Sequence, residues 1–181
     1  MVEDWEGVVF DLDGTVVHLP VDWDTVAAEL ASELADLDGT AMAHDTWDYL
    51  DLAREADSLD RAERVIAQHE IVGARQSERL PLADYVEDVD VHVGVCSLNC
   101  EQACRVALET HDLERSVDAI VGRDTVSNWK PDPEPLRAVI DELGVSPESS
   151  VFIGDSPRDA ATAAPLAVSF RDVEDMLATI E

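Results

Sequence analysis

Residues 7–15 read G-V-V-F-D-L-D-G-T, a short apolar run that ends in two aspartates and a glycine. An apolar run of this length, bounded by turn-forming residues, is typical of a buried strand. Similar runs recur at residues 91–96, 119–121, 151–153 and 167–170, and helical periodicity marks residues 99–110, 134–143, 157–166 and 173–180. Strands that alternate with helices predict an α/β fold, with a Rossmann-like, mostly parallel sheet flanked by helices.

Residues 21–80 break this alternation, because the segment holds no proline, only two glycines, and apolar residues at helical spacing. The pattern predicts three or four helices and no strand. A plain strand-to-strand crossover needs far fewer residues. We therefore expect a small all-helical cap domain at residues 18–81, inserted after the first strand of an α/β core domain formed by residues 1–17 and 82–181.

The charge is strongly unbalanced, with 41 acidic against 12 basic residues and a net charge of −29, while 46% of the residues are hydrophobic. A disordered acidic chain would be poor in apolar residues, so we expect a folded protein. Binding to nucleic acid or to a membrane surface needs a basic footprint, and neither partner is expected. The excess of acid and the scarcity of lysine are typical of a halophilic protein.

Salt dependence tests this halophilic interpretation. At molar salt the Debye length is about 3 Å, so repulsion among the carboxylates is largely screened, whereas dilution restores it. We predict that transfer from molar KCl to low ionic strength lowers the melting temperature, measured by thermal unfolding at constant pH. An unchanged melting temperature would contradict a halophilic protein.

The first residues, M-V-E-D-W-E-G, have neither the basic region nor the apolar core of a signal peptide. No apolar stretch approaches the roughly 20 residues that a membrane-spanning helix needs. We therefore expect a soluble, cytoplasmic protein without a membrane partner.

Three cysteines, Cys96, Cys100 and Cys104, recur at every fourth residue. This spacing is not usual for zinc, and the simpler interpretation is a helix face of buried thiols.

Polar residues follow the expected strands at once. Asp11 and Asp13 follow the first, Ser97 follows the second, and Asp155 follows the strand at residues 151–153. Because ligands of an open parallel sheet bind beyond the carboxyl ends of its strands, these side chains should converge on one site. Clustered carboxylates suit Mg²⁺, and phosphoryl transfer needs such charge neutralisation.

One lysine, Lys130, stands in the stretch S-N-W-K-P-D-P-E-P at residues 127–135, while the other eleven basic residues are arginines. An ammonium is a compact point charge on a flexible stem, whereas a guanidinium is a planar fork. A crowded site with carboxylates, a metal and a phosphoryl group has room for a compact ammonium but little room for a planar guanidinium. We therefore expect Lys130 to be a site residue and not a surface charge.

Four motifs, D-L-D-G-T-V, S-L-N, K-P-D-P-E-P and G-D-S-P-R-D, stand in this order along the chain. Together they resemble the haloacid-dehalogenase-like (HAD) phosphohydrolases over nearly the whole chain. The helical insertion resembles the small cap of the subgroup with phosphoglycolate-phosphatase-like and phosphoglucomutase-like members. The resemblance implies a Mg²⁺-dependent phosphatase that acts on a small phosphorylated metabolite through an aspartyl-phosphate. The sequence does not determine the oligomeric state, and we expect a monomer or homodimer.

The resemblance also implies roles for the motif residues. Asp11 would be the nucleophile, and Asp13 would protonate the leaving oxygen and later activate water. Ser97, the Leu98 backbone N–H and Lys130 would bind the phosphoryl group. The Mg²⁺ ligands would be Asp11, the backbone carbonyl of Asp13, and Asp155, with Asp159 either a direct ligand or a neighbour of one.

Local structure offers alternatives for several of these residues. Asp11 and Asp13 could form a polar turn, and Asn99 with Gln102 makes a capping-box pattern. Ser156 and Asp159 fit the N-cap and N3 positions of a helix. Other candidate substrate contacts, each also interpretable as a surface or ion-pair residue, are His18, Trp129, Arg158 and the cap arginines 54, 61, 64, 75 and 79.

Other functions remain open at this stage. A sugar-phosphate mutase could use the same scaffold, and a non-catalytic domain could bind phosphorylated ligands. A haloalkanoate dehalogenase fits less well, because that branch has no use for Asp13 or a metal. The chain also lacks the acid and serine that the family often has after D-G-T, so the substrate stays open. It has Ala164-Pro165-Leu166-Ala167 where relatives usually place a glycine before the next strand.

Overall fold

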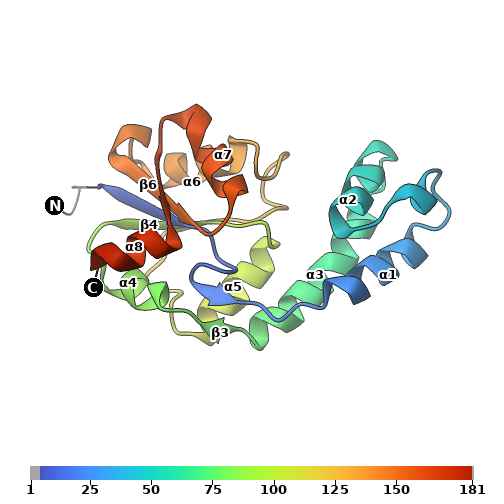
Figure 1. Ribbon diagram of the computed structural model, residues 1–181, viewed down its shortest axis with the longest axis horizontal. Helices are drawn as coiled ribbons and strands as arrows, with labels where there is room; N and C mark the ends of the chain where they lie inside the picture. The colour runs from blue at the N-terminus through green and yellow to red at the C-terminus, as the bar shows by residue number, and fades with distance from the viewer. Residues whose placement is uncertain (1–4, 181) are drawn as a thin grey trace.

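The computed structural model describes residues 5–180 and is built around a five-stranded sheet (Figure 1). Its strands are β1 (Gly7–Phe10), β4 (His92–Cys96), β5 (Ala119–Val121), β6 (Ser150–Gly154) and β7 (Ser169–Asp172). They lie in the order β5-β4-β1-β6-β7, and every neighbouring pair is parallel. The predicted parallel sheet is confirmed, with β1 at its centre.

Helices cover both faces of this sheet. The core helices are α4 (Leu82–Asp88), α5 (Glu101–Thr110), α6 (Glu134–Leu143), α7 (Pro157–Ala163) and α8 (Val173–Ile180). Successive side chains of a strand point to opposite faces, so Val8 and Phe10 pack on the side of α4, α5 and α8 while Val9 packs on the side of α6. This two-sided burial explains why β1 reads as a continuous apolar run.

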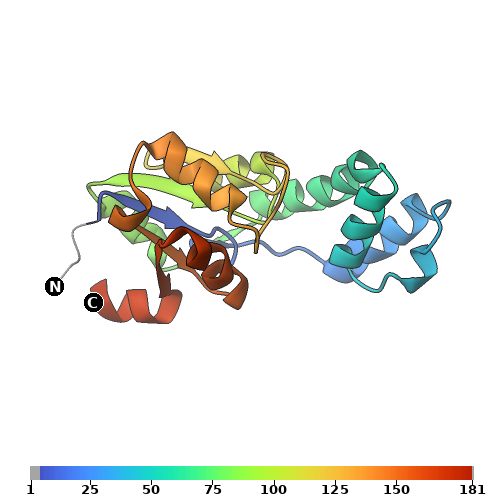
Figure 2. The same cartoon turned by 90° about the horizontal axis from the view of Figure 1, so that it is seen from above.

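The inserted segment forms a helical block beside the sheet (Figures 1 and 2). It consists of α1 (Trp23–Glu33), a 3-10 turn η1 (Thr40–Met42), α2 (Thr46–Glu55) and α3 (Leu59–Arg75). Asp22 and Asp45 cap α1 and α2 by accepting backbone N–H bonds. The block has an apolar cluster of its own, centred on Leu30, Leu50 and Ile66. The division into two domains at residues 18 and 81 stays a prediction.

The expectation that residues 21–80 hold no strand is wrong. Strand β3 (Glu78–Arg79) pairs antiparallel with β2 (Val17–His18), and the Leu80 N–H donates to the Val16 carbonyl. The chain therefore enters and leaves the cap side by side. Two-residue strands show no periodicity, so this pairing left no sequence signal.

Some helices and strands begin or end at other residues than predicted, because turns lie between them. Residues 97–100 form a turn, so α5 begins at Glu101 and not at 99. After α7, residues 164–166 form the 3-10 turn η3, and Ala167 adopts a left-handed φ of 58°, so β7 starts only at Ser169. A left-handed φ favours glycine, which agrees with the glycine usual in relatives at this turn. The short helix α4 was not predicted.

The cysteines are all buried, as expected, but they do not share a helix face. Cys96 ends β4, Cys100 precedes α5, and Cys104 lies within α5. Burial raises the pKa of the Cys96 thiol to about 12, so this thiol stays protonated at neutral pH. Across residues 5–180 no helix is long and apolar enough to cross a membrane.

Candidate active site

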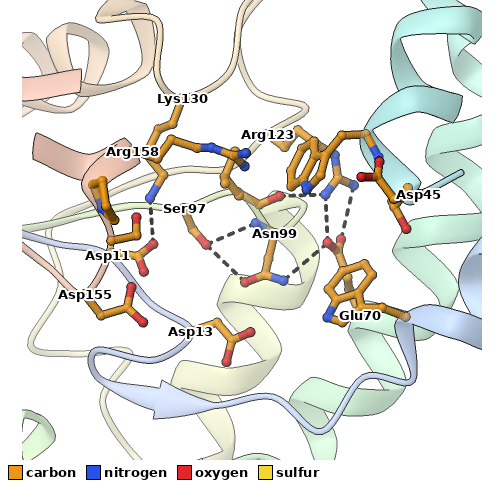
Figure 3. Close-up of a pocket in the computed structure, with 16 residues that line it drawn as sticks. Asp11, Asp13, Asp45, Glu70, Ser97, Asn99, Arg123, Lys130, Asp155 and Arg158 are labelled. Carbon is orange, nitrogen blue, oxygen red and sulfur yellow. Dashed lines mark hydrogen bonds and ion pairs between the residues drawn. The ribbon is translucent and has the colours of Figure 1, made fainter. Parts of the chain in front are cut away.

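A cavity of about 710 Å³ opens between the carboxyl edge of the sheet and the cap (Figure 3). Six of the seven residues expected at the site line it: Asp11, Asp13, Ser97, Leu98, Lys130 and Asp155. The cap contributes Trp23, Asp45, Thr46, Trp47 and Glu70, and the core adds Asn99, Arg123, Ser156, Pro157 and Arg158. The strand ends therefore do converge on one cavity, and the inserted helices supply part of its lining.

Asp11 stands at the centre of this edge, directly after β1. Its backbone N–H donates to the Ile153 carbonyl at 2.8 Å, which continues the pairing of β1 with β6 one residue beyond the strand. The side chain is 7% exposed, and its Oδ1 accepts a hydrogen bond from Lys130 Nζ at 2.7 Å. Burial raises the pKa of Asp11 to about 7, although the Lys130 ammonium opposes the rise.

Lys130 bridges two carboxylates with its single ammonium. Its Nζ lies 2.7 Å from Asp11 Oδ1 and 2.6 Å from Asp159 Oδ1, and the residue is 2% exposed. Burial alone would lower the pKa of Lys130, but Asp11 and Asp159 raise it above its usual value. The lone lysine is therefore a buried cation at the site.

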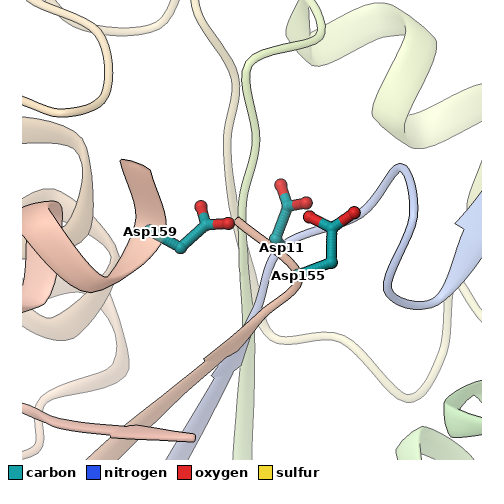
Figure 4. A group of neighbouring side chains, drawn as sticks. All are labelled: Asp11, Asp155 and Asp159. Atoms are coloured by element: carbon teal, nitrogen blue, oxygen red, sulfur yellow. The ribbon is translucent and has the colours of Figure 1, made fainter. Parts of the chain in front are cut away.

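Three carboxylates form a compact cluster at this point (Figure 4). One oxygen from each of Asp11, Asp155 and Asp159 lies within 4.8 Å of the others. One ammonium cannot neutralise three carboxylates, and hard oxygen donors at this spacing suit Mg²⁺. Gly14 makes room for the cluster: it has a φ of 89°, and a Cβ there would lie 2.1 Å from Asp155 Oδ2. The residues present therefore fit a divalent cation.

Asp13 lies beside this cluster, and its carboxylate is not part of the three-residue group. Its Oδ1 accepts the Leu19 N–H at 2.8 Å and lies 3.7 Å from His18 Nδ1. Burial raises the pKa of Asp13 above its ordinary value. A carboxyl group at the cavity wall with a raised pKa is suited to donate a proton as a general acid.

Asp159 serves the helix start and the site together. Ser156 and Asp159 form a capping box at α7, in which Ser156 Oγ donates to Asp159 Oδ2 at 2.6 Å. The other oxygen holds Lys130, and the residue is fully buried. Gly154 allows this close packing, because a Cβ there would lie 2.7 Å from Asp159. The expected N-cap arrangement is confirmed.

Ser97 is 2% exposed and belongs to a turn that the capping-box interpretation described wrongly. Its Oγ donates to Asn99 Oδ1 at 3.2 Å and accepts the Asn99 N–H at 3.1 Å. The N-cap of α5 is Cys100 and makes no side-chain cap bond. The Asn99 side chain instead donates to Glu70 Oε1 at 3.3 Å, so this turn is tied to the cap.

A buried ion cluster of Arg123, Glu63 and Glu70 also connects the Ser97–Asn99 turn with α3. The sequence analysis did not predict this cluster. Arg123 donates to Glu70 at 2.7 Å, to Glu63 at 2.7 Å and to the Leu98 carbonyl at 2.6 Å. Both glutamates belong to the cap helix α3, and Glu70 also accepts the Cys100 N–H at 2.9 Å. Arg123 and Glu70 are nearly or fully buried. The cluster therefore fixes the Ser97–Asn99 turn relative to α3.

Glu70 left a signal in the sequence. The buried positions of α3 include residues 62, 66, 70 and 74, so an acid falls within a row of apolar residues at helical spacing. A charge on a buried face requires a partner, which marks Glu70 as unusual. Arg123 left none, since it stands in a loop whose packing depends on the tertiary fold.

Of the other candidate substrate contacts, Arg158 lines the cavity, whereas His18, Trp129 and the arginines 54, 61, 64, 75 and 79 do not. Arg61, Arg64 and Arg79 pair with carboxylates, as the surface interpretation expected. Arg54 stacks on Trp129, with its guanidinium carbon 3.4 Å from the ring centre. Arg158 lines the cavity and stacks on Trp47 of α2 at 4.8 Å.

Comparison with known proteins shows what this chain is similar to. Residues 80–173 match the model of the family described as haloacid dehalogenase-like hydrolase. The chain is 36% identical to the phosphoglycolate phosphatase of Rhodospirillum rubrum over 87% of this chain and 75% of that protein. It is 32% identical to that of Cereibacter sphaeroides over 91% of this chain and 83% of that protein.

A solved HAD-superfamily hydrolase from Ehrlichia chaffeensis has the same fold, with a TM-score of 0.61 and 18% identity. The superposition covers 99% of this chain and 98% of that one. None of these likenesses bears on the salt dependence that the charge suggests, which stays a prediction.

Proposed function

Because the chain belongs to the haloacid dehalogenase-like hydrolases, we propose that it hydrolyses a small organic phosphomonoester through an aspartyl-phosphate on Asp11. The protein is a hydrolase of the phosphatase type. The observation that carries the proposed mechanism is the contact of 2.7 Å between Asp11 and the buried Lys130, beside the three-carboxylate cluster. The residue that we propose as the nucleophile, a buried ammonium and carboxylates that fit a divalent cation therefore lie together.

In the first step an oxygen of Asp11 attacks phosphorus, and the bond from phosphorus to the leaving oxygen breaks. The leaving oxygen takes a proton from Asp13, whose Oδ1 is engaged by the Leu19 N–H, so that Oδ2 carries the proton. In the second step Asp13 accepts a proton from water as the water attacks phosphorus. The bond from phosphorus to Asp11 then breaks, and inorganic phosphate leaves.

Charge on the transferring group needs compensation in a cavity lined by carboxylates. Mg²⁺, held by Asp11, Asp155 and the Asp13 backbone carbonyl, would supply positive charge to the phosphoryl oxygens. Lys130 adds an ammonium, and Ser97 with the Leu98 N–H would donate hydrogen bonds to the same oxygens. Asp159 is fully buried and accepts hydrogen bonds from Lys130 and Ser156, so we assign it to holding Lys130 beside Asp11 and Asp155.

The substrate that we propose is phosphoglycolate or a close analogue. Two curated relatives that match most of this chain are named phosphoglycolate phosphatases. A cavity of about 710 Å³ admits a small metabolite with its leaving group directed toward the cap. The cap then restricts which leaving groups fit.

Activity against a panel of phosphomonoesters tests this proposal. With Mg²⁺, and with KCl varied from low to molar concentration, we expect hydrolysis of p-nitrophenyl phosphate and, more efficiently, of phosphoglycolate. Removing the metal with EDTA should lower the rate by at least about 100-fold, and added Mg²⁺ should restore it. Folded, metal-loaded protein that is inert on the whole panel would overturn the phosphatase mechanism. Interconversion of sugar phosphates without release of phosphate would favour a mutase.

A further inference from the structure

The cations that line the cavity are not equivalent. Arg123 is matched by Glu63 and Glu70, and Lys130 is matched by two aspartates. Arg158 is the third cation in the lining, and it forms no ion pair with a carboxylate within residues 5–180. In a chain with a net charge of −29, a half-buried arginine without an acidic partner is conspicuous.

The position of Arg158 leaves its donors available. It lies at the start of α7, three residues after Asp155, and its side chain extends across the cavity toward the cap (Figure 3). Its guanidinium carbon lies 4.8 Å from the centre of the Trp47 ring of α2. Stacking uses the face of a guanidinium and leaves the N–H groups at its edge free to bind an anion in bidentate fashion.

We propose that Arg158 binds a carboxylate on the leaving group of the substrate, and that this contact selects phosphorylated carboxylates over neutral phosphomonoesters. The inference rests on the proposed function, because it places the phosphoryl group at Asp11 and the carboxylate at Arg158. It assigns a specificity residue to the core helix α7, while Trp47 of the cap holds the guanidinium in place.

The charges around the cavity support a carboxylate ligand. The acidic side chains that line it are Asp11, Asp13, Asp45, Glu70 and Asp155, and they would repel a second anionic group of the substrate. Asp45 is engaged as the N-cap of α2, where its Oδ1 accepts the Trp47 and Asp48 N–H groups. Arg158 is therefore the lining cation whose charge is left for a substrate carboxylate.

A competing explanation gives Arg158 only a mechanical role. Its stacking on Trp47 joins the core to the cap, so its loss could loosen closure over any substrate. The two explanations differ in substrate dependence. A carboxylate ligand makes the loss specific to substrates that carry a carboxylate, whereas a latch affects all phosphomonoesters alike.

The test compares phosphoglycolate with ethyl phosphate, which has the same carbon skeleton but no carboxylate. Arg158→Gln should lower the ratio of kcat/KM for phosphoglycolate to that for ethyl phosphate by about 10- to 100-fold, as expected for a lost charge-assisted hydrogen bond. Arg158→Lys keeps the charge without the fork and should restore part of this ratio. The matched control is Arg137→Gln, which removes an exposed arginine from α6, away from the cavity.

Binding gives a readout that does not depend on turnover. In an Asp11→Asn background, calorimetry should show that Arg158→Gln weakens phosphoglycolate binding far more than ethyl phosphate binding. An equal loss for both ligands, or no loss for either, would overturn the role of Arg158. Wild-type protein that hydrolyses neither ester, yet binds phosphoglycolate through Arg158, would contradict the proposed phosphatase mechanism while leaving this inference intact.

Discussion

Asp11→Asn is expected to abolish phosphomonoester hydrolysis, with kcat falling by at least about 10³-fold. A carboxamide cannot form the acyl-phosphate bond, and its shape otherwise matches that of the carboxylate. The loss should appear in kcat/KM for every substrate of the panel, because the nucleophile acts on phosphorus and not on the leaving group. After acid quenching of a reaction with radiolabelled substrate, phosphate should be recovered on wild-type protein and not on the variant.

Stability provides the control for this variant. Asp11→Asn removes one of three clustered carboxylates and leaves Lys130 paired with Asp159, so the metal-free melting temperature should not fall. Asp141→Asn on α6 makes the same chemical change at an exposed position and should keep full activity. If Asp11→Asn retained substantial turnover with an intact fold, the nucleophile would have to be another group.

The part of the site that the sequence predicted is the part that strand ends determine. Asp11, Ser97 and Asp155 each follow a core strand directly, and parallel strands place their carboxyl ends at one edge. A residue at such a position needs no tertiary information to be located. Lys130 was identified differently, because it is the single lysine of the chain. In the structure its ammonium lies between Asp11 and Asp159.

The part that could not be predicted depends on how the cap packs on the core. Arg123 and Glu70 are 53 residues apart, and their ion pair exists only because α3 lies beside the turn after β4. Asn99 fits a capping-box pattern locally, but its side chain bonds to Ser97 and Glu70. Here a long-range contact with a buried carboxylate prevails over a weak local preference.

Arg158 is a second case in which a contact between the cap and the core could not be predicted from the sequence. Its sequence position, in the first turn of a helix, is compatible with an exposed surface arginine. In the structure it lines the cavity and stacks on Trp47 of α2, a contact that the sequence does not reveal. The position of Arg158 in the cavity depends on two segments that are far apart in the sequence, so the sequence alone did not place it there.

Lys130→Arg is expected to leave the fold intact and to lower kcat by at least about 100-fold. The ammonium sits 2.7 Å and 2.6 Å from oxygens of two different carboxylates at a position that is 2% exposed. A guanidinium is larger, planar and more extended, so it must displace Asp11 or occupy the space of the phosphoryl group. The measurement is kcat for p-nitrophenyl phosphate, together with the melting temperature in EDTA and in Mg²⁺.

Lys130→Met separates charge from shape. It removes the cation and leaves Asp11 and Asp159 buried without it, an arrangement that costs about 3–5 kcal/mol in comparable buried pairs. We expect a lower melting temperature in EDTA, partly recovered in Mg²⁺ because a bound cation stabilises the folded state. Lys130→Arg should show no such loss, since it keeps the charge. Arg137→Lys, the reverse exchange at an exposed position, should be neutral in both measurements. Full activity of Lys130→Arg would mean that the single lysine is an accident of composition and that the site needs only a positive charge there.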